Sequence, residues 1–551
     1  MSAAVSTSPY MLASLTAPVR RMRKRAGFSA SSSRARVHPA YPRRTTAGSR
    51  SGATHIPAWG FHMQPEADRG STVIIRVIAV LAAGITFYQL TRPGFLFGIT
   101  PDIAAWLGGS IRLVHGSMPY RDFDLVQPPG FSLLASPIAF LSEWIGTRDA
   151  LAILRLCTPL LSAASVLLIG KVVRRHGRVA VIVACGVMAL YPAELYALRS
   201  GLLESVVDCF CLAGAAIMFE GDSIAGSRRR LVLGGVAFGI AGTVKAPAIV
   251  PVLVLAVLCL SDIRQRLLPF AAGIIAGFGV PTLPFFLIAP GAFLRDVVIT
   301  PLSSIPAGNR VSILVRLGDI TGTSAFGGAS ASIIATVVIV GIVVAAFLPR
   351  RRRPSTLEWF AIAATLLAAI AQLGPSYYFA NYTAFVTPFL GLLLGISIAR
   401  LVEHRSPRIA VGIAAVGVAI VFTHQVFAIH GSTTSDIAGV VDAVIPAGGC
   451  TLSDAPSKLV TTNRFVATTS HCNNLIDPEG ATLSYGFGSA GAQRLWSGMV
   501  EESDYLLTST PFADWDIPPD ARLRAYVASN FRLLRIEGLL FYVRNGFPSG
   551  T

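Results

Sequence analysis

The sequence predicts a polytopic α-helical membrane protein with about eleven spans and a small soluble α/β domain at its C-terminus. Of its 551 residues, 53% are hydrophobic and only 14% are charged, which is too apolar for a soluble chain of this length. Between residues 71 and 430, apolar runs of about 18 residues or more recur, each long enough to cross a membrane. Beyond residue 430 the runs shorten and alternate with Gly, Pro, Asn and Asp, which is typical of a soluble domain.

The predicted spans are separated by charged or Pro- and Gly-rich segments. They lie near residues 72–91, 150–172, 178–198, 201–219, 231–246, 247–261, 267–289, 331–348, 357–374, 380–399 and 409–429. The transmembrane part therefore covers residues 71–430, and the C-terminal domain covers residues 431–551. Two connections, residues 92–149 and 290–330, are too long to be simple links, and loops of that size usually carry function.

Orientation follows from the short basic loops, which stay on the cytoplasmic side. With the N-terminus in the cytoplasm, every basic cluster falls in a cytoplasmic loop; the clusters are 171–178, 228–230, 264–266, 350–353 and 400–408. This agreement requires that the apolar segment 131–146 does not cross, so we interpret it as an amphipathic or re-entrant segment on the outer surface. The C-terminal domain is then extracytoplasmic, and the predicted location is the plasma membrane.

The N-terminal residues 1–70 hold 11 Lys and Arg, but their only acidic residues are Glu66 and Asp68. This segment therefore carries over half of the net charge of +17. This composition predicts a disordered cytoplasmic tail. The alternatives are an arm that lies on anionic lipid, a transit peptide, or a start codon downstream, for example at Met63, which would leave residues 1–62 untranslated. No folded basic module accompanies the charge, so no nucleic-acid partner is expected.

Five of the seven cysteines lie in apolar spans, where a small polarizable side chain is ordinary packing. Cys450 and Cys472 are the only two in the C-terminal domain. They are expected to form one disulfide if that domain faces an oxidising compartment.

The first long outer loop carries the most informative residues. Pro101 marks a helix start with Asp102 in its first turn, and apolar residues recur at helical spacing as far as Val114, which predicts a surface helix. A carboxylate there could serve as a general base toward a hydroxyl, with the charged residues Arg121, Asp122 and Asp124 nearby. The alternative is that Asp102 only complements the helix dipole and that residues 121–124 form a solvated loop.

Four other residues, near the ends of predicted spans, carry candidate functional groups. Glu204 could face a cavity at the outer start of the fourth span, or pair with Arg199. Lys245 could be a functional cation or a lysine that snorkels to the interface. Tyr378 and Tyr382 lie at the outer entry to the tenth span, where aromatic belts are common.

The order of these features resembles the C-type glycosyltransferase superfamily, which includes protein O-mannosyltransferases, lipid A aminoarabinose transferases and actinobacterial cell-envelope mannosyl- and arabinofuranosyltransferases. In those enzymes an Asp opens the first outer loop, followed by a short surface helix, a G-x-x-Y-R-D-F-like stretch and a Pro-Pro pair before a second surface helix. Here the matching features are Asp102, the helix through Val114, residues 116–124 and Pro128-Pro129. The resemblance covers residues 72–430 and, more weakly, the C-terminal domain, with Asp454 and Asp477 as landmarks.

The resemblance implies an inverting hexosyl- or pentosyltransferase that moves a sugar from a polyprenyl-monophosphate donor to a hydroxyl of a cell-envelope glycan, lipid or protein. It implies Asp102 as the general base and Lys245 as the cation on the donor phosphate. The implied donor- or acceptor-binding residues are Tyr120, Arg121, Asp122, Asp124, Glu204, Lys245, Tyr378 and Tyr382. No cofactor is expected, although Asp122, Asp124 and Glu204 could hold a divalent cation.

The rival function is a transporter or flippase for lipid-linked sugars. Transporters tend to show internal repeats and broken helices in two halves, whereas this sequence shows no such repeat and gathers its charges at the outer boundary. An envelope sensor is a third alternative, but the sequence shows no cytoplasmic signalling domain.

Overall fold

The computed structural model describes most of residues 65–551. Outside the described part are residues 1–64, 101, 103, 303–310, 325–327, 349–352, 376–377, 404–405, 468–471, 473–475, 487–488, 516–518 and 551. The predictions of a basic tail and of a start at Met63 therefore fall almost entirely outside the described residues, as does part of the basic cluster 350–353.

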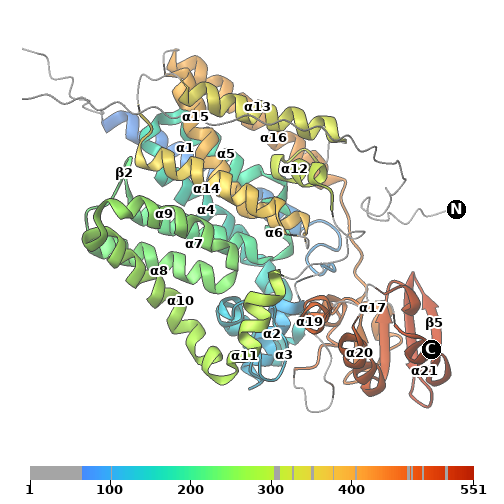
Figure 1. The fold of residues 1–551 in the computed structure, drawn as a ribbon. Coiled ribbons are helices and arrows are strands. Elements are labelled where there is room, and N and C mark those ends of the chain that lie inside the picture. The colour runs from blue at the N-terminus through green and yellow to red at the C-terminus, as the bar shows by residue number, and fades with distance from the viewer. Residues whose placement is uncertain are drawn as a thin grey trace, which may run out of the picture. The chain divides into compact units, whose positions relative to one another are not determined.

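The described part of the chain is a multi-pass bundle of apolar helices followed by a small sheet (Figure 1). Each of the eleven predicted spans overlaps mainly with one helix: α1 (Pro65–Leu90), α4 (Thr158–Val173), α5 (Gly177–Leu190), α7 (Leu203–Met218), α8 (Arg228–Val244), α9 (Ile249–Cys259), α10 (Leu268–Ile288), α13 (Ala329–Phe347), α14 (Thr356–Leu373), α15 (Thr387–Val402) and α16 (Pro407–His430). By length and composition, seven continuous helical stretches of the described residues can cross a membrane, or eight if one bent pair counts as a span. The number is below eleven partly because the stretches Gly130–Leu190 and Ala246–Ile288 each contain two predicted spans.

Prolines and glycines set the main breaks in the bundle. The third span was predicted to continue to residue 198, but α5 ends at Leu190 because Pro192 starts a new helix, α6 (Pro192–Ser200). Gly201 then takes a left-handed conformation (φ 72°), and α6 and α7 meet at 112°. Between α8 and α9 the backbone is extended at Lys245, just before Pro247, where the sequence predicted a turn.

Helices α8 and α10 pack closely because each carries two glycines four residues apart (Figure 1). A Cβ atom on Gly235 would lie 2.3 Å from the carbonyl oxygen of Phe270, and one on Gly277 would lie 2.3 Å from that of Val236. Only glycine allows this approach of the two backbones.

The first long loop forms helices that are more buried than predicted. A π-helical turn (Ala104–Gly108) leads into α2 (Gly109–Val114), and residues 105–112 are all buried. A short helix lies where the sequence predicted one, but it is covered rather than exposed, because α3 (Gly130–Leu156) and the side chains of Phe465 and Ile476 pack on it. Helix α3 itself is broken at Gly146 (φ 84°), and its first half exposes apolar side chains such as Phe140 and Trp144.

Shorter elements complete the membrane part. They include the strands β1 (Phe219–Glu220) and β2 (Ser223–Ile224), the helices α11 (Pro290–Leu294) and α12 (Ile313–Thr321), a π-helical turn (Arg295–Ile299), and a 3-10 helix (Ala380–Val386) that leads into α15.

The C-terminal residues form a four-stranded sheet of order β3-β4-β6-β5, with β3 parallel to β4 and the other neighbours antiparallel. The strands are β3 (Thr451–Ser453), β4 (Tyr505–Thr508), β5 (Phe531–Ile536) and β6 (Leu539–Arg544), and the helices are α17 (Ala438–Asp442), α18 (Ser457–Thr461), α19 (Pro478–Tyr485), α20 (Ala490–Glu502) and α21 (Ala521–Asn530). This is an α/β arrangement, as the sequence predicted.

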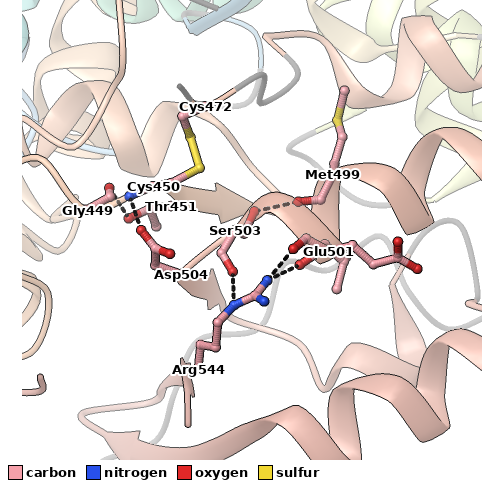
Figure 2. Close-up of a disulfide and its surroundings, with 10 residues drawn as sticks. Gly449, Cys450, Thr451, Cys472, Met499, Glu501, Ser503, Asp504 and Arg544 are labelled. Carbon is pink, nitrogen blue, oxygen red and sulfur yellow. Dashed lines mark hydrogen bonds between the residues drawn. A yellow bond between two sulfur atoms is a disulfide. The ribbon is translucent and has the colours of Figure 1, made fainter. Parts of the chain in front are cut away.

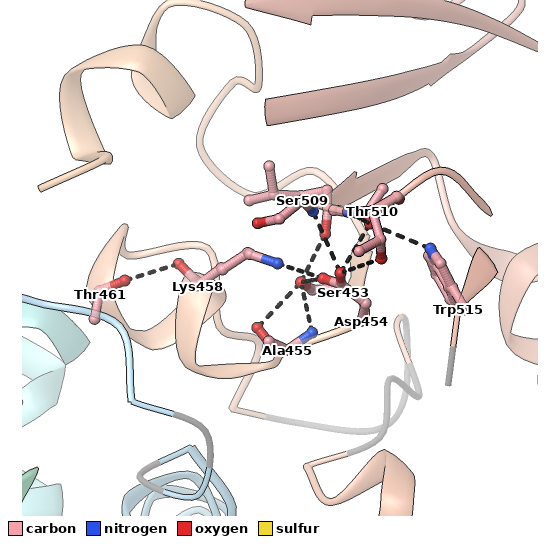
Figure 3. Close-up of polar contacts among 10 residues, drawn as sticks. Ser453, Asp454, Ala455, Lys458, Thr461, Ser509, Thr510 and Trp515 are labelled. Carbon is pink, nitrogen blue, oxygen red and sulfur yellow. Dashed lines mark hydrogen bonds and ion pairs between the residues drawn. The ribbon is translucent and has the colours of Figure 1, made fainter. Parts of the chain in front are cut away.

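Two polar clusters hold this sheet together. Cys450 and Cys472 form a disulfide, and the amide of Cys450 donates to Asp504 (3.1 Å), which ties the start of β3 to β4 (Figure 2). At the other end of these strands, Asp454 accepts hydrogen bonds from Thr508 Oγ1 (2.8 Å) and from Lys458 (Figure 3). The landmark Asp454 therefore has a structural role.

Candidate active site

The residues proposed from the sequence fall into two separate cavities. The first, which we call the apolar cavity, has a volume of about 340 Å³ and is walled mainly by apolar side chains. Its polar members are Asp102, Glu204, Lys245 and Asp477 among others. The apolar members include Trp106, Val126, Val207, Pro247, Ile249, Val250, Val297, Pro301, Phe379, Phe385 and Leu483.

An ion pair between Lys245 and Glu204 lies in the wall of the apolar cavity. The Nζ atom of Lys245 is 2.5 Å from Oε1 of Glu204, and the Asn381 amide donates to the same oxygen (3.1 Å). Lys245 also lies over the ring of Tyr382, 3.8 Å from its centroid. The residue Lys245 is only 9% exposed, so the alternative of a lysine that snorkels to the interface is wrong.

The local backbone explains why these two residues meet. Lys245 takes an extended conformation at the break after α8, and Glu204 occupies the first turn of α7, where the helix dipole favours a carboxylate. The alternative in which Glu204 pairs with Arg199 is wrong, because Arg199 stacks on the ring of Phe95 (4.5 Å) and Glu204 binds Lys245.

Asp102 lines the same cavity. Its carbonyl accepts a hydrogen bond from the amide of Trp106 (3.3 Å), but it precedes the first helical turn and does not lie within it. Burial raises the pKa of its carboxyl group to about 7; the charge of Lys245 opposes this rise, whereas Glu204 and Asp477 add to it. A carboxyl group with this pKa can accept a proton near neutral pH.

The two tyrosines also line the apolar cavity. The hydroxyl of Tyr378 donates to Asp319 Oδ2 (2.9 Å), and Arg316 lies over its ring (4.5 Å). Tyr382 forms the floor beneath Lys245. Of the candidate residues, the structure therefore brings Asp102, Glu204, Lys245, Tyr378 and Tyr382 together.

The other four candidates lie in a second cavity of about 310 Å³, which we call the polar cavity. Its lining combines the first long loop, residues near α11 and the C-terminal part: Arg112, Tyr120, Arg121, Asp122, Phe123, Asp124, Ala292, Arg295, Ile476, Tyr485, Leu495 and Met499. Asp122 pairs with Arg121 (2.7 Å), and Asp124 pairs with Arg295 (2.6 Å). Burial raises the pKa of Asp124 to about 6, with Asp296 adding to the rise and Arg295 opposing it.

The structure does not bring Glu204 together with Asp122 and Asp124, so these three residues do not form one cation site. Among the described residues, no group of three or more His, Cys, Asp or Glu side chains could hold a metal ion.

Asp477 and Arg295, which line the cavities, and Asn381, which donates to Glu204, are among the residues that were not predicted to be functional from the sequence. Asp477 caps α19 by accepting a hydrogen bond from the amide of Gly480 (2.9 Å), and it also lines the apolar cavity. Its Asp-Pro sequence indicated the start of a helix, but it gave no sign that the residue would lie beside this cavity. Asn381 lies within the aromatic segment that the sequence singled out. Arg295 lies in the second long loop, whose length was the available signal.

Comparison with known proteins agrees with this architecture. A sequence model of glycosyltransferase family 87 matches residues 126–376, which is less than half of the chain. The structure is similar to ArnT from Cupriavidus metallidurans bound to undecaprenyl phosphate, with a TM-score of 0.55 and 14% identity, over 86% of this chain and 98% of ArnT. The protein has the C-type glycosyltransferase fold. The apo state of the same ArnT gives a TM-score of 0.55 with 13% identity over the same shares of the two chains.

The predicted resemblance to the C-type superfamily is thereby confirmed, and the family match and the C-type fold together support a membrane glycosyltransferase. The segment matched by the family 87 model contains Glu204 and Lys245, whereas Asp102, Tyr378 and Tyr382 lie outside it. No curated protein sequence matches the chain.

Proposed function

We propose that this protein transfers a sugar from a polyprenyl-monophosphate donor to a hydroxyl group of a cell-envelope acceptor, with inversion at the anomeric carbon. One observation carries the proposal: a single cavity with mainly apolar walls contains both the Asp102 carboxyl group and the Lys245 ammonium group. These are the two groups that the reaction requires, a base for the acceptor and a cation for the leaving phosphate.

The donor side of the cavity suits a lipid phosphate. The walls around Lys245 include Pro247, Ile249 and Val250, which can contact an isoprenoid chain. A lysine ammonium group has three hydrogens, so Lys245 can keep its bond to Glu204 and donate to a phosphate oxygen as well. The presence of undecaprenyl phosphate in the structurally similar ArnT supports this class of donor.

The reaction is a single displacement. The acceptor oxygen attacks the anomeric carbon while the bond from that carbon to the phosphate oxygen breaks, and the electron pair of that bond leaves with the polyprenyl phosphate. Asp102, in its ionised form, takes the proton of the attacking hydroxyl. Lys245 stabilises the negative charge that grows on the leaving phosphate, in a site where apolar walls strengthen the interaction.

The proposed location is the outer face of the plasma membrane, where a lipid-linked donor needs no nucleotide. The basic clusters of the short loops support an N-terminus in the cytoplasm and the sheet domain outside. The disulfide in that domain is in keeping with an oxidising compartment.

The test is sugar transfer by purified protein in liposomes, with labelled polyprenyl-phosphate sugars and a panel of envelope acceptors. Asp102→Asn should lower the rate by about 10²–10⁴-fold without loss of folding, because Asn cannot accept the proton. Asp514→Asn, at an exposed position, is the matched control. Movement of the donor across the bilayer without transfer, equal in wild type and Asp102→Asn, would instead support a transporter.

A further inference from the structure

The polar cavity has no part in the donor chemistry described above. We propose that it binds an uncharged, hydroxyl-rich saccharide portion of the acceptor, an inference that rests on the proposed glycosyl transfer. It would hold the acceptor so that one hydroxyl reaches Asp102.

The two cavities adjoin through two segments of the chain. In the first loop, Asp124 lines the polar cavity, and Val126, two residues later, lines the apolar one. In the C-terminal part, Ile476 lines the polar cavity, and the next residue, Asp477, lines the apolar one. The charge of Asp477 raises the pKa of both Asp102 and Asp124, which indicates that it lies within electrostatic reach of both. The two cavities are therefore lined by neighbouring residues of the same two segments, which is the geometric basis for placing the acceptor in the polar cavity.

The charges of the polar cavity are compensated within the protein. Arg121 is paired with Asp122 (2.7 Å), and Arg295 is paired with Asp124 (2.6 Å) and Asp296 (2.8 Å). The lining holds three arginines, Arg112 included, and two carboxylates, and a third carboxylate, Asp296, pairs with Arg295 from outside the lining. A phosphate would have to compete with these carboxylates for each paired arginine, so the lining favours a neutral ligand.

The same lining matches the hydrogen bonding of a saccharide. A guanidinium group carries five N–H donors, and a carboxylate offers lone pairs on both oxygens, so each ion pair leaves donors and acceptors side by side. A hydroxyl group can donate and accept at once, and can therefore bridge such a pair. The pairing also holds the side chains in place before the ligand arrives, which lowers the entropy cost of binding.

The loop that carries these residues is held in one conformation. Tyr120 has a positive φ (68°), which is unusual for a bulky residue. Its hydroxyl donates to the carbonyl of Gln127 (2.6 Å), and its ring packs edge-on against Phe293 (4.9 Å between centroids). A strained backbone that is fixed by its neighbours is typical of binding sites. The volume of about 310 Å³ is at the lower end for ligand pockets.

The C-terminal part supplies Ile476, Tyr485, Leu495 and Met499, one third of the twelve lining residues. The side chain of Arg295 lies 5.5 Å from the centroid of the Tyr485 ring, so an aromatic face is part of the lining. Through these residues the C-terminal domain would contribute to recognition of the acceptor.

The test measures saccharide binding to the Asp102→Asn protein, which should bind the acceptor but not consume it. Neutral envelope oligosaccharides, free and linked to lipid, are titrated against the protein in detergent and followed by saturation-transfer NMR. Arg121→Ala and Asp124→Asn should each raise the dissociation constant about 10-fold or more, the loss expected for hydrogen bonds to charged groups. Binding of polyprenyl phosphate should stay within about 2-fold, because that ligand contacts the other cavity.

The matched controls are Arg535→Ala and Asp514→Asn, both at exposed positions of the sheet domain, which should leave saccharide binding unchanged. The side chain of Arg121 is 53% exposed, so its removal should not unfold the protein. The inference is upheld if the free oligosaccharide binds and the two cavity substitutions weaken that binding. It is also upheld if only the lipid-linked form binds in this way, and that result would identify a glycolipid as the acceptor.

Two results would overturn it: saccharide binding that is equal in Arg121→Ala, Asp124→Asn and the controls, or a cavity that prefers inorganic phosphate to neutral saccharide. A failure of the proposed function looks different. In that case no labelled donor gives transfer in wild-type protein, whereas saccharide binding still depends on Arg121 and Asp124.

Discussion

The two cavities differ in how their charged side chains are paired and in how polar their walls are. In the apolar cavity the ammonium group of Lys245 lies against one carboxylate, Glu204, and an aromatic ring, with apolar walls around them. In the polar cavity both Arg121 and Arg295 are paired with carboxylates, and the walls are mainly polar. The first arrangement suits a reaction in which charge develops, and the second suits recognition of a neutral ligand. Substrate binding and bond breaking can thus be changed separately.

The largest effect is expected from Lys245→Met. Loss of the cation should lower kcat by about 10²–10³-fold, because the leaving phosphate loses its main electrostatic stabilisation. Saccharide binding in the polar cavity should be unchanged. Transfer assays and saccharide titrations on the same preparation measure both, with Lys171→Met, at an exposed position in the last turn of α4, as the matched control. An equal loss of saccharide binding would break the proposed division between the cavities.

Lys245→Met leaves the buried carboxylate of Glu204 without its cation, which can cost about 3–5 kcal/mol of stability. The double variant Lys245→Met/Glu204→Gln removes this cost. It should regain the melting temperature of the wild type but not its activity. Recovery of transfer in the double variant would show that Lys245 acts only through stability.

The second expected effect is on pH dependence. Asp102 must be ionised to act as a base, so the transfer rate should rise with pH through about 7 and fall below it. The charged groups that act on Asp102 are Lys245, which lowers its pKa, and Glu204 and Asp477, which raise it. Glu204→Gln should therefore move the rising limb to lower pH by roughly one unit, within the usual range for nearby charges. A limb that stays in place would argue against Asp102 as the titrating base.

A smaller effect is expected from the disulfide. Cys450 and Cys472 close a loop of 22 residues, and Cys472 lies five residues before Asp477, so the bond restrains a segment that lines both cavities (Figure 2). Cys450→Ser/Cys472→Ser should cost about 3 kcal/mol of stability and raise the KM for the acceptor a few-fold, with a smaller change for the donor. Steady-state kinetics with each substrate varied in turn will check this. An increase confined to the donor KM would contradict the assignment of the polar cavity.

The smallest expected effect is on the stability of the folded protein, which the buried carboxyl group of Asp102 lowers when it is ionised. The pKa of Asp102 is raised on folding, so its ionised form is disfavoured in the folded protein, and stability should fall as pH rises from about 4 to about 7. Asp102→Asn removes this penalty and should raise the melting temperature by a few degrees at pH 8. The gain should shrink toward pH 5, where the folded wild type keeps the carboxyl group protonated. A thermal melt of both proteins at the two pH values provides the measurement, and a gain that is larger at pH 5 would contradict the raised pKa.

The sequence by itself determined the membrane-spanning helices and the superfamily. Apolar runs and their Pro and Gly breaks are local properties, so the eleven predicted spans coincide with helices, and Pro247 lies at the predicted turn. The residues from Asp102 to Pro129 were enough to show the resemblance, because they all lie in one loop and can therefore be read as one continuous motif. The predicted ends of the spans were wrong where a single residue, and not the hydrophobicity of the run, ended the helix, as Pro192 does.

The tertiary structure alone decided which candidate residues meet. Lys245 and Glu204 are 41 positions apart, and Asp477 reaches the cavity from the C-terminal part of the chain, so no local pattern links them. The division of the candidates into an apolar and a polar cavity, and the burial of residues 105–112, also depend on packing between distant segments. Hydrophobic periodicity specifies which face of a helix is buried, but the partner on that face is chosen by the packing of the whole chain.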